Sequence, residues 1–135
     1  MNNIVIIDYG MGNTKSVQRA IEKIGGQSHL TSDKKIIEDA NKIILPGVGA
    51  FNAGMEELNR LNLIEPIIRA VNHGAILFGI CLGMQLLFES SDENSETKGL
   101  GLMDGKIKII PTQMNGKLVR KIPHIGWNSI KKKPR

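Results

Sequence analysis

The chain has 135 residues, of which 41% are hydrophobic, 4% aromatic and 23% charged. This length fits one domain with an aliphatic core, and no run reaches the roughly 18 apolar residues of a membrane span. The formal charge is +5, but the last five residues, KKKPR, supply four of these charges and leave +1 (5 − 4) on the remainder. Because no basic stripe interleaved with aromatic residues is present, the sequence argues against nucleic-acid binding.

The cellular compartment is indicated by the N-terminus and by the cysteine count. The opening sequence MNNIVIIDYG has no basic segment and no cleavage pattern of a secretory signal. Cys81 is the only cysteine, so no internal disulfide can form. We therefore expect a cytoplasmic protein.

The first two thirds of the chain alternate between predicted strands and predicted helices. In chain order, the pattern predicts a strand over 3–8, a turn over 9–13, a helix on Val17, Ala20, Ile21 and Ile24, a strand near 27–30, a short helix capped by Ser32 and reaching Asp39, a strand over 42–47, a helix from Leu63 to Val71, a strand over 75–80 and a helix over 84–88. Such alternation predicts an α/β fold, a parallel sheet with helices on both faces.

The pattern changes beyond residue 90. The polar, acidic segment SSDENSETKG, residues 90–99, indicates a solvated loop. KIKIIP, KLVRKIP and WNSIKKK then resemble strands, with turns at NG and at PHIG. No helical pattern separates them, so we expect an antiparallel extension of the sheet.

Residues 79–83, Gly-Ile-Cys-Leu-Gly, have the form of a nucleophile elbow. Glycines on both sides permit a tight turn from strand to helix, which lifts the central side chain above the sheet. A thiol at the start of a helix is favoured as the thiolate, and the N–H group of Leu82 can donate to a developing oxyanion. From these five residues alone, a small buried structural cysteine fits equally well.

Two glycine-rich turns follow other predicted strands. LPGVGAF, residues 45–51, lies at the carboxyl end of its strand, where ligands bind in parallel sheets. Gly47 and Gly49 permit unusual backbone torsions, so the Val48–Gly49 peptide could present an N–H group toward Cys81. An ordinary strand-to-helix turn explains this segment as well. YGMGN, residues 9–13, lacks the dinucleotide-binding spacing, so we expect no cofactor there but a turn near the ligand edge of the sheet.

Five segments together resemble a known family: IVIIDYGMGN, IILPGVGAF, GICLGMQLLFE, KGLGLMDGKI and PHIGWN. They are similar to class I, triad-type glutamine amidotransferases, and within these to the glutaminase subunits of imidazole glycerol phosphate synthase. The resemblance runs from residue 1 to about residue 130. It implies a flavodoxin-like fold, glutamine as substrate and a cyclase subunit as heterodimer partner, in histidine biosynthesis.

The resemblance also implies roles for individual residues. At the site and at the partner interface these are Cys81 as nucleophile forming a glutamyl thioester, Val48 or Gly49 with Leu82 as oxyanion donors, Gly47 in the oxyanion strand, Gln85 as substrate contact, and Asn13 and Trp127 as cyclase contacts. No metal and no cofactor is implied. A paralogue that supplies ammonia for amidated surface sugars shares these motifs, so the pathway stays open.

The family's catalytic His and Glu come from an HPE segment, which is absent here. His29, His73 and His124 do not match it, and the resemblance gives none of them the role of base. We therefore expect residues 1–135 to form the N-terminal two thirds of an amidotransferase domain, with an apolar sheet face exposed and with the strand-like segment SIKKKPR as an unpaired edge. The alternative function is a synthase-binding fragment without turnover.

Overall fold

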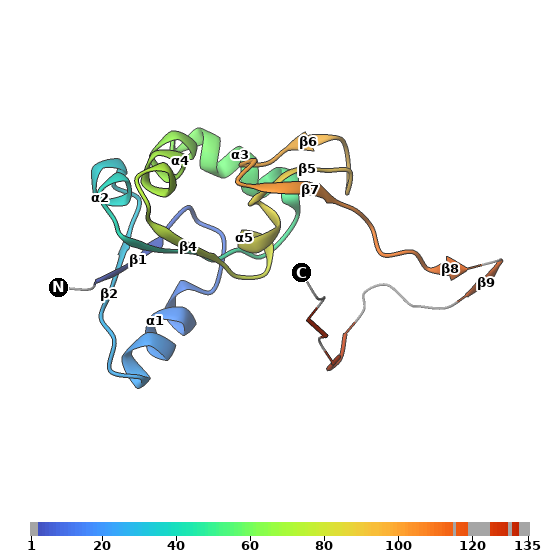
Figure 1. The fold of residues 1–135 in the computed structure, drawn as a ribbon, viewed down its shortest axis with the longest axis horizontal. Helices are drawn as coiled ribbons and strands as arrows, with labels where there is room; N and C mark the ends of the chain where they lie inside the picture. The colour runs from blue at the N-terminus through green and yellow to red at the C-terminus, as the bar shows by residue number, and fades with distance from the viewer. Residues whose placement is uncertain (1–2, 115, 119–124, 130, 133–135) are drawn as a thin grey trace.

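A four-stranded parallel sheet forms the centre of the protein (Figure 1). The computed structural model describes residues 3–114, 116–118, 125–129 and 131–132. Sheet A contains β1 (Ile4–Ile7), β2 (Ser28–Thr31), β3 (Lys42–Leu45) and β4 (Ile76–Gly79), in the order β2-β1-β3-β4. All three pairings are parallel, as the alternating sequence pattern predicts.

Helices lie on both faces of sheet A (Figure 1). Helix α1 (Thr14–Lys23) lies on one face, and α2 (Lys34–Glu38), α3 (Phe51–Arg60) and α4 (Ile64–Asn72) lie on the other. The two-faced arrangement is confirmed. The sequence pattern gave no expectation for α3, whose glycine and two asparagines weaken its helical signal.

Side chains that precede the helices set where two of them begin. The Asn13 side chain accepts a hydrogen bond of 3.2 Å from the N–H group of Ser16 and caps α1. Asp33 caps α2 through bonds from Lys35 and Ile36. The expected cap at Ser32 is therefore wrong by one residue, because a carboxylate at position 33 reaches both free N–H groups.

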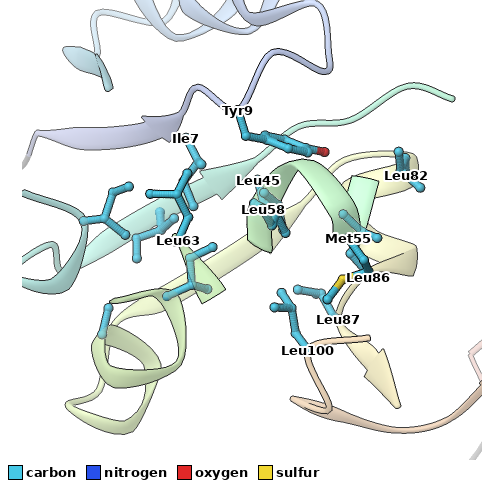
Figure 2. Packing of buried hydrophobic residues seen from close by; sticks show 14 of the residues in the cluster. Ile7, Tyr9, Leu45, Met55, Leu58, Leu63, Leu82, Leu86, Leu87 and Leu100 are labelled. Atoms are coloured by element: carbon cyan, nitrogen blue, oxygen red, sulfur yellow. The ribbon is translucent and has the colours of Figure 1, made fainter. Parts of the chain in front are cut away.

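The core lies between sheet A and the helices α2, α3 and α4 (Figure 2). Ile7 and Leu45 from the sheet are fully buried, as are Leu58 from α3 and Ile67 from α4. Burying an aliphatic side chain of this size contributes about 1.5–3 kcal/mol. Leu82 and Leu86 extend the same cluster toward the Cys81 turn, so that turn is built onto the core.

The segment after Cys81 differs from the expected helix. Helix α5 contains only Leu82–Gln85, and Phe88 begins strand β5 (Phe88–Ser91). The carbonyl groups of Leu86 and Leu87 accept bonds from the N–H groups of Leu100 and Leu102, at 2.8 and 2.9 Å. Because these two carbonyl oxygens bond with residues outside the helix, they do not continue its hydrogen-bond pattern, and the helix ends after one turn.

A second, mixed sheet corrects the expected antiparallel extension. Sheet B contains β5, β6 (Thr97–Lys98) and β7 (Met103–Ile107), in the order β6-β5-β7. β5 pairs with β6 antiparallel, but with β7 parallel. Residues 90–99 are also not a simple loop, because Ser90 and Ser91 are buried in β5. The strand expected at KIKIIP ends at Ile107.

The described C-terminal residues contain one short hairpin. β8 (Gln113–Met114) pairs antiparallel with β9 (Lys117–Leu118). Residues 127–129 and 131–132 form no strand, contrary to the expectation for WNSIKKK. Much of KLVRKIP, and His124, fall outside the described residues. Across the described ranges, no helix is long and apolar enough to cross a membrane.

The face of sheet A beside α1 is partly open. β4 is the edge strand of the described sheet, and its Ile76 and Phe78 are 66% and 61% exposed. They line a groove of about 260 Å³ together with Ile4, Ile43 and Ile44. An apolar sheet face is therefore exposed in the part of the chain that the structure describes, as expected. The open edge was expected at SIKKKPR, however, and the described residues of that segment, 129 and 131–132, form no strand.

Candidate active site at Cys81

Cys81 occupies a strained turn between β4 and α5. Its backbone has φ 54° and ψ −117°, which non-glycine residues rarely adopt, and the residue is exposed. The carbonyl group of Ile80 accepts a bond of 3.0 Å from Gly83 N–H, and that of Cys81 accepts one of 3.0 Å from Met84 N–H. This positive φ holds the thiol at the top of the turn, which is the geometry of a nucleophile elbow.

Both glycines of the elbow are required by close backbone contacts. A Cβ atom placed on Gly79 would lie 2.5 Å from the backbone N and Cα of Met84. One placed on Gly83 would overlap the carbonyl oxygen of Leu45 in β3. Any side chain at either position would therefore push α5 away from the sheet.

The turn after β3 lies directly against this elbow. A Cβ atom on Gly47 would lie 2.5 Å from the Tyr9 hydroxyl and 2.9 Å from both Gly83 N and Leu82 Cβ. Gly47 is therefore needed for close packing and does not have a positive φ, whereas Gly49 has φ +104°. The sequence expectation of an unusual torsion is correct for Gly49 alone.

Tyr9 fixes the start of the 46–51 segment. Its buried hydroxyl donates a bond of 2.7 Å to the carbonyl oxygen of Pro46. Figure 2 shows its ring in the core with the hydroxyl oxygen toward Leu82. Burial, and secondarily the charge of Cys81, raise the pKa of Tyr9 well above its usual value, so the hydroxyl remains a donor even at an alkaline pH at which a free tyrosine would ionise. The YGMGN turn thus lies at the ligand edge, as expected.

Three backbone N–H groups expected to serve as oxyanion donors are free. Those of Val48, Gly49 and Leu82 make no hydrogen bond with any described residue. Val48 is 54% exposed, whereas the Leu82 side chain is buried. Free donors beside a nucleophile are the requirement for stabilising an oxyanion, and their assignment to this role remains a prediction.

A small pocket opens beside Gln85. The Gln85 N–H group donates a hydrogen bond of 3.2 Å to the Cys81 carbonyl oxygen, so the two residues lie one helical turn apart. The pocket measures about 180 Å³ and is lined by Gln85, Glu93, Ile107, Lys108 and Ile109. It thus presents one carboxylate and one ammonium group next to apolar surface.

Glu93 is the residue that sequence reasoning missed. It lies within the acidic segment 90–99, for which the sequence pattern indicates a solvated loop. Its Oε2 atom accepts a bond of 3.0 Å from the N–H group of Phe51, 42 residues earlier. The return of the chain through β5 brings it there, and no local pattern in the sequence encodes that pairing.

The two histidines that the structure describes lie away from Cys81. His29 is in β2, three strand spacings from β4, or about 14 Å. His73 ends α4, before β4 begins, and so lies at the opposite end of that strand from Cys81. Within the described ranges, no group of three or more His, Cys, Asp or Glu residues could hold a metal ion.

The two expected interface residues lie on the surface. Asn13 is exposed and caps α1 through its side chain. Trp127 is 104% exposed and lies outside the described helices and strands. Asn13 therefore has a structural role of its own, whereas no packing within the described chain accounts for Trp127.

Comparison with known families identifies the fold. The family described as class I glutamine amidotransferase matches residues 5–133. The chain belongs to the class I glutamine amidotransferases. Its flavodoxin-like fold is shared with a crystal structure of a glutamine amidotransferase, with a TM-score of 0.66 and 20% sequence identity, over 77% of this chain and 55% of that one.

Several curated proteins are more similar in sequence. The imidazole glycerol phosphate synthase subunit HisH of Syntrophotalea carbinolica is 46% identical over 94% of this chain. The HisH subunits of Geobacter sulfurreducens and Geobacillus kaustophilus are 45% and 48% identical, over 99% and 95% of the chain. This chain spans 62%, 66% and 61% of the lengths of these three relatives.

Proposed function

We propose that this chain carries the nucleophile and the glutamine-binding pocket of a glutaminase that supplies ammonia to imidazole glycerol phosphate synthase. The observation that carries the proposal is the strained elbow at Cys81, an exposed thiol followed directly by the free N–H group of Leu82. The thiol adds to the carboxamide carbon of glutamine, and the oxygen gains negative charge that Leu82 and Val48 or Gly49 stabilise. The C–N bond then breaks, the proton of the thiol ends on the departing nitrogen, and ammonia leaves a glutamyl thioester. Water hydrolyses this thioester to glutamate and regenerates the thiol.

The pocket beside Gln85 supports an amino-acid substrate. The Oε1 atom of Glu93 makes no hydrogen bond with the described residues, so it can accept from the α-ammonium group of glutamine. Lys108 on the same pocket can pair with the α-carboxylate. Gln85 contacts the substrate between this pocket and Cys81.

The synthase subunit is the proposed partner. The relatives are named as subunits of imidazole glycerol phosphate synthase, which supports a heterodimer with a cyclase subunit in histidine biosynthesis, in the cytoplasm. Exposed Trp127 is the proposed anchor, because aromatic residues dominate such interfaces. Asn13 is the second proposed contact with the cyclase subunit. Ammonia then passes directly from the glutaminase site to this partner.

Affinity labelling tests the nucleophile. A chloroketone analogue of L-glutamine should alkylate Cys81, as located by peptide mass spectrometry, and Cys81→Ser should abolish the label. Excess L-glutamine should protect Cys81, whereas D-glutamine should not. Equal labelling of Cys81 in the presence and absence of L-glutamine would contradict the assignment of glutamine as the substrate.

A second candidate function, a synthase-binding subunit without turnover, is favoured by the positions of His29 and His73. Removing the base of a catalytic triad lowers turnover by about 10⁶-fold in a well-studied hydrolase. We therefore expect no measurable glutamate release from the 135-residue chain, alone or with a cyclase subunit. Cys81-dependent release by the chain alone would show that it contains a base.

A further inference from the structure

The segment that carries the proposed oxyanion donors is held at both ends by side chains from distant parts of the chain. At its start, Tyr9 donates to the Pro46 carbonyl at 2.7 Å. At its end, Glu93 accepts from Phe51 N–H at 3.0 Å. Between these two anchors, the N–H groups of Val48 and Gly49 make no hydrogen bond with the described residues.

The second anchor replaces a missing helix cap. Ala50 occupies the N-cap position of α3 and offers no side-chain acceptor. The free N–H groups at a helix start are normally satisfied by an Asp, Asn, Ser or Thr at that position. Here the carboxylate of Glu93 supplies the acceptor from outside the helix.

Glu93 is itself held in place by buried structure. Its backbone N–H group donates a bond of 3.2 Å to the hydroxyl of Ser91, which is buried at the end of β5. The next residue, Asn94, donates through Nδ2 to Oδ1 of Asn52 in α3 at 3.4 Å. The carboxylate therefore reaches Phe51 from a fixed position.

We propose that Glu93 is a positioning residue that, by capping α3, holds residues 47–50 against the Cys81 elbow. α3 is also packed on the elbow helix, since a Cβ atom on Gly54 would lie 3.1 Å from Leu82 Cδ2. Glu93 also lines the Gln85 pocket. The consequence of this capping for catalysis rests on the proposed function, whereas the capping itself does not.

Two variants separate anchoring from charge. In Glu93→Gln the amide oxygen can still accept from Phe51 N–H, whereas Glu93→Ala has no acceptor. The N–H group of Gly54 donates a bond of 3.1 Å to the Ala50 carbonyl, so its exchange reports on the end of the 47–50 segment. In ligand-free protein, amide hydrogen exchange at Phe51 and Gly54 should stay within about twofold of wild type in Glu93→Gln. It should rise by about tenfold or more in Glu93→Ala, because a bond to a charged acceptor is lost. Glu96→Ala is the control, since Glu96 pairs on the same segment with exposed Lys106.

The amide proton resonance of Phe51 gives a second readout. It should move upfield in Glu93→Ala and far less in Glu93→Gln, while His29, on the distant strand β2, stays unchanged in both variants. Wild-type exchange at Phe51 and Gly54 in Glu93→Ala, or equal acceleration in Glu93→Gln and Glu93→Ala, would overturn the proposal. Should Glu93→Ala not fold, a Glu93→Gln protein with Phe51 exchange tenfold faster than wild type would overturn it as well. Because no glutamine is present, neither result depends on the glutaminase assignment.

Discussion

The hydroxyl of Tyr9 donates a hydrogen bond of 2.7 Å to the carbonyl oxygen of Pro46, 37 residues further along the chain. Both residues are buried, and they follow the neighbouring strands β1 and β3. The bond therefore joins two loops at the carboxyl edge of sheet A. It places the start of the 47–50 segment beside the Cys81 elbow.

Replacing Tyr9 by Phe should destabilise the protein by about 1–3 kcal/mol, because the buried Pro46 carbonyl loses its donor. Urea unfolding followed by circular dichroism measures the change. Thr97→Val is the matched control, since Thr97 donates to the Ser95 carbonyl at the exposed surface, and it should cost less than about 0.5 kcal/mol. Equal stability of wild type and Tyr9→Phe would mean that the bond contributes nothing.

The same tyrosine predicts a dependence on pH. Burial raises the pKa of Tyr9 in the folded state, whereas tyrosine in the unfolded chain ionises near about pH 10. Above that pH the unfolded state loses a proton that the folded state retains, so folding stability must fall as the pH rises. The stability advantage of wild type over Tyr9→Phe should therefore shrink from about pH 10 upward. The free energies of unfolding should be compared from about pH 9 to about pH 11, roughly one unit on either side of the ordinary tyrosine pKa. A wild-type advantage that stays constant over this range would contradict the linkage.

The elbow glycines should tolerate no side chain. In Gly83→Ala the new methyl group would overlap the Leu45 carbonyl, which requires α5 to leave the sheet. We expect a loss of about 4 kcal/mol or more, the range reserved for severe steric conflicts. Gly25→Ala has open space around it and only a positive φ, so it should cost about 1–2 kcal/mol. Thermal unfolding of both variants compares them, and similar melting temperatures would refute the steric requirement.

Sequence periodicity was sufficient for sheet A because its strands are short apolar runs separated by helices. The elbow was also predictable, since Gly79, Cys81 and Gly83 follow one another locally. Sheet B could not be predicted, because β5 pairs with β7 in parallel and no local sequence pattern indicates this pairing. Glu93 was missed for the same reason, as its role depends on an N–H group 42 residues away.

Trp127 should be the energetic centre of the proposed cyclase contact. Trp127→Ala should weaken binding of a cyclase subunit by about 2 kcal/mol or more, which is a factor of about 30 in Kd. Ile125→Ala is the control, because Ile125 is a neighbouring apolar residue that is 87% exposed. Isothermal titration calorimetry with the cyclase subunit gives both affinities. A Trp127→Ala protein that binds as tightly as wild type would exclude this residue from the interface.

The open face of sheet A should make the chain prone to self-association. Phe78 and Ile76 project from the edge strand β4 into solvent, and an exposed apolar edge is a template for pairing with another chain. Phe78→Thr should therefore reduce aggregation in light scattering, while the free energy of unfolding changes by less than about 0.5 kcal/mol. Leu77→Thr is the matched control on the same strand, because Leu77 packs against the core and its loss should cost about 1–3 kcal/mol. If Phe78→Thr destabilises the protein as much as Leu77→Thr, Phe78 is buried in solution and the face is not open.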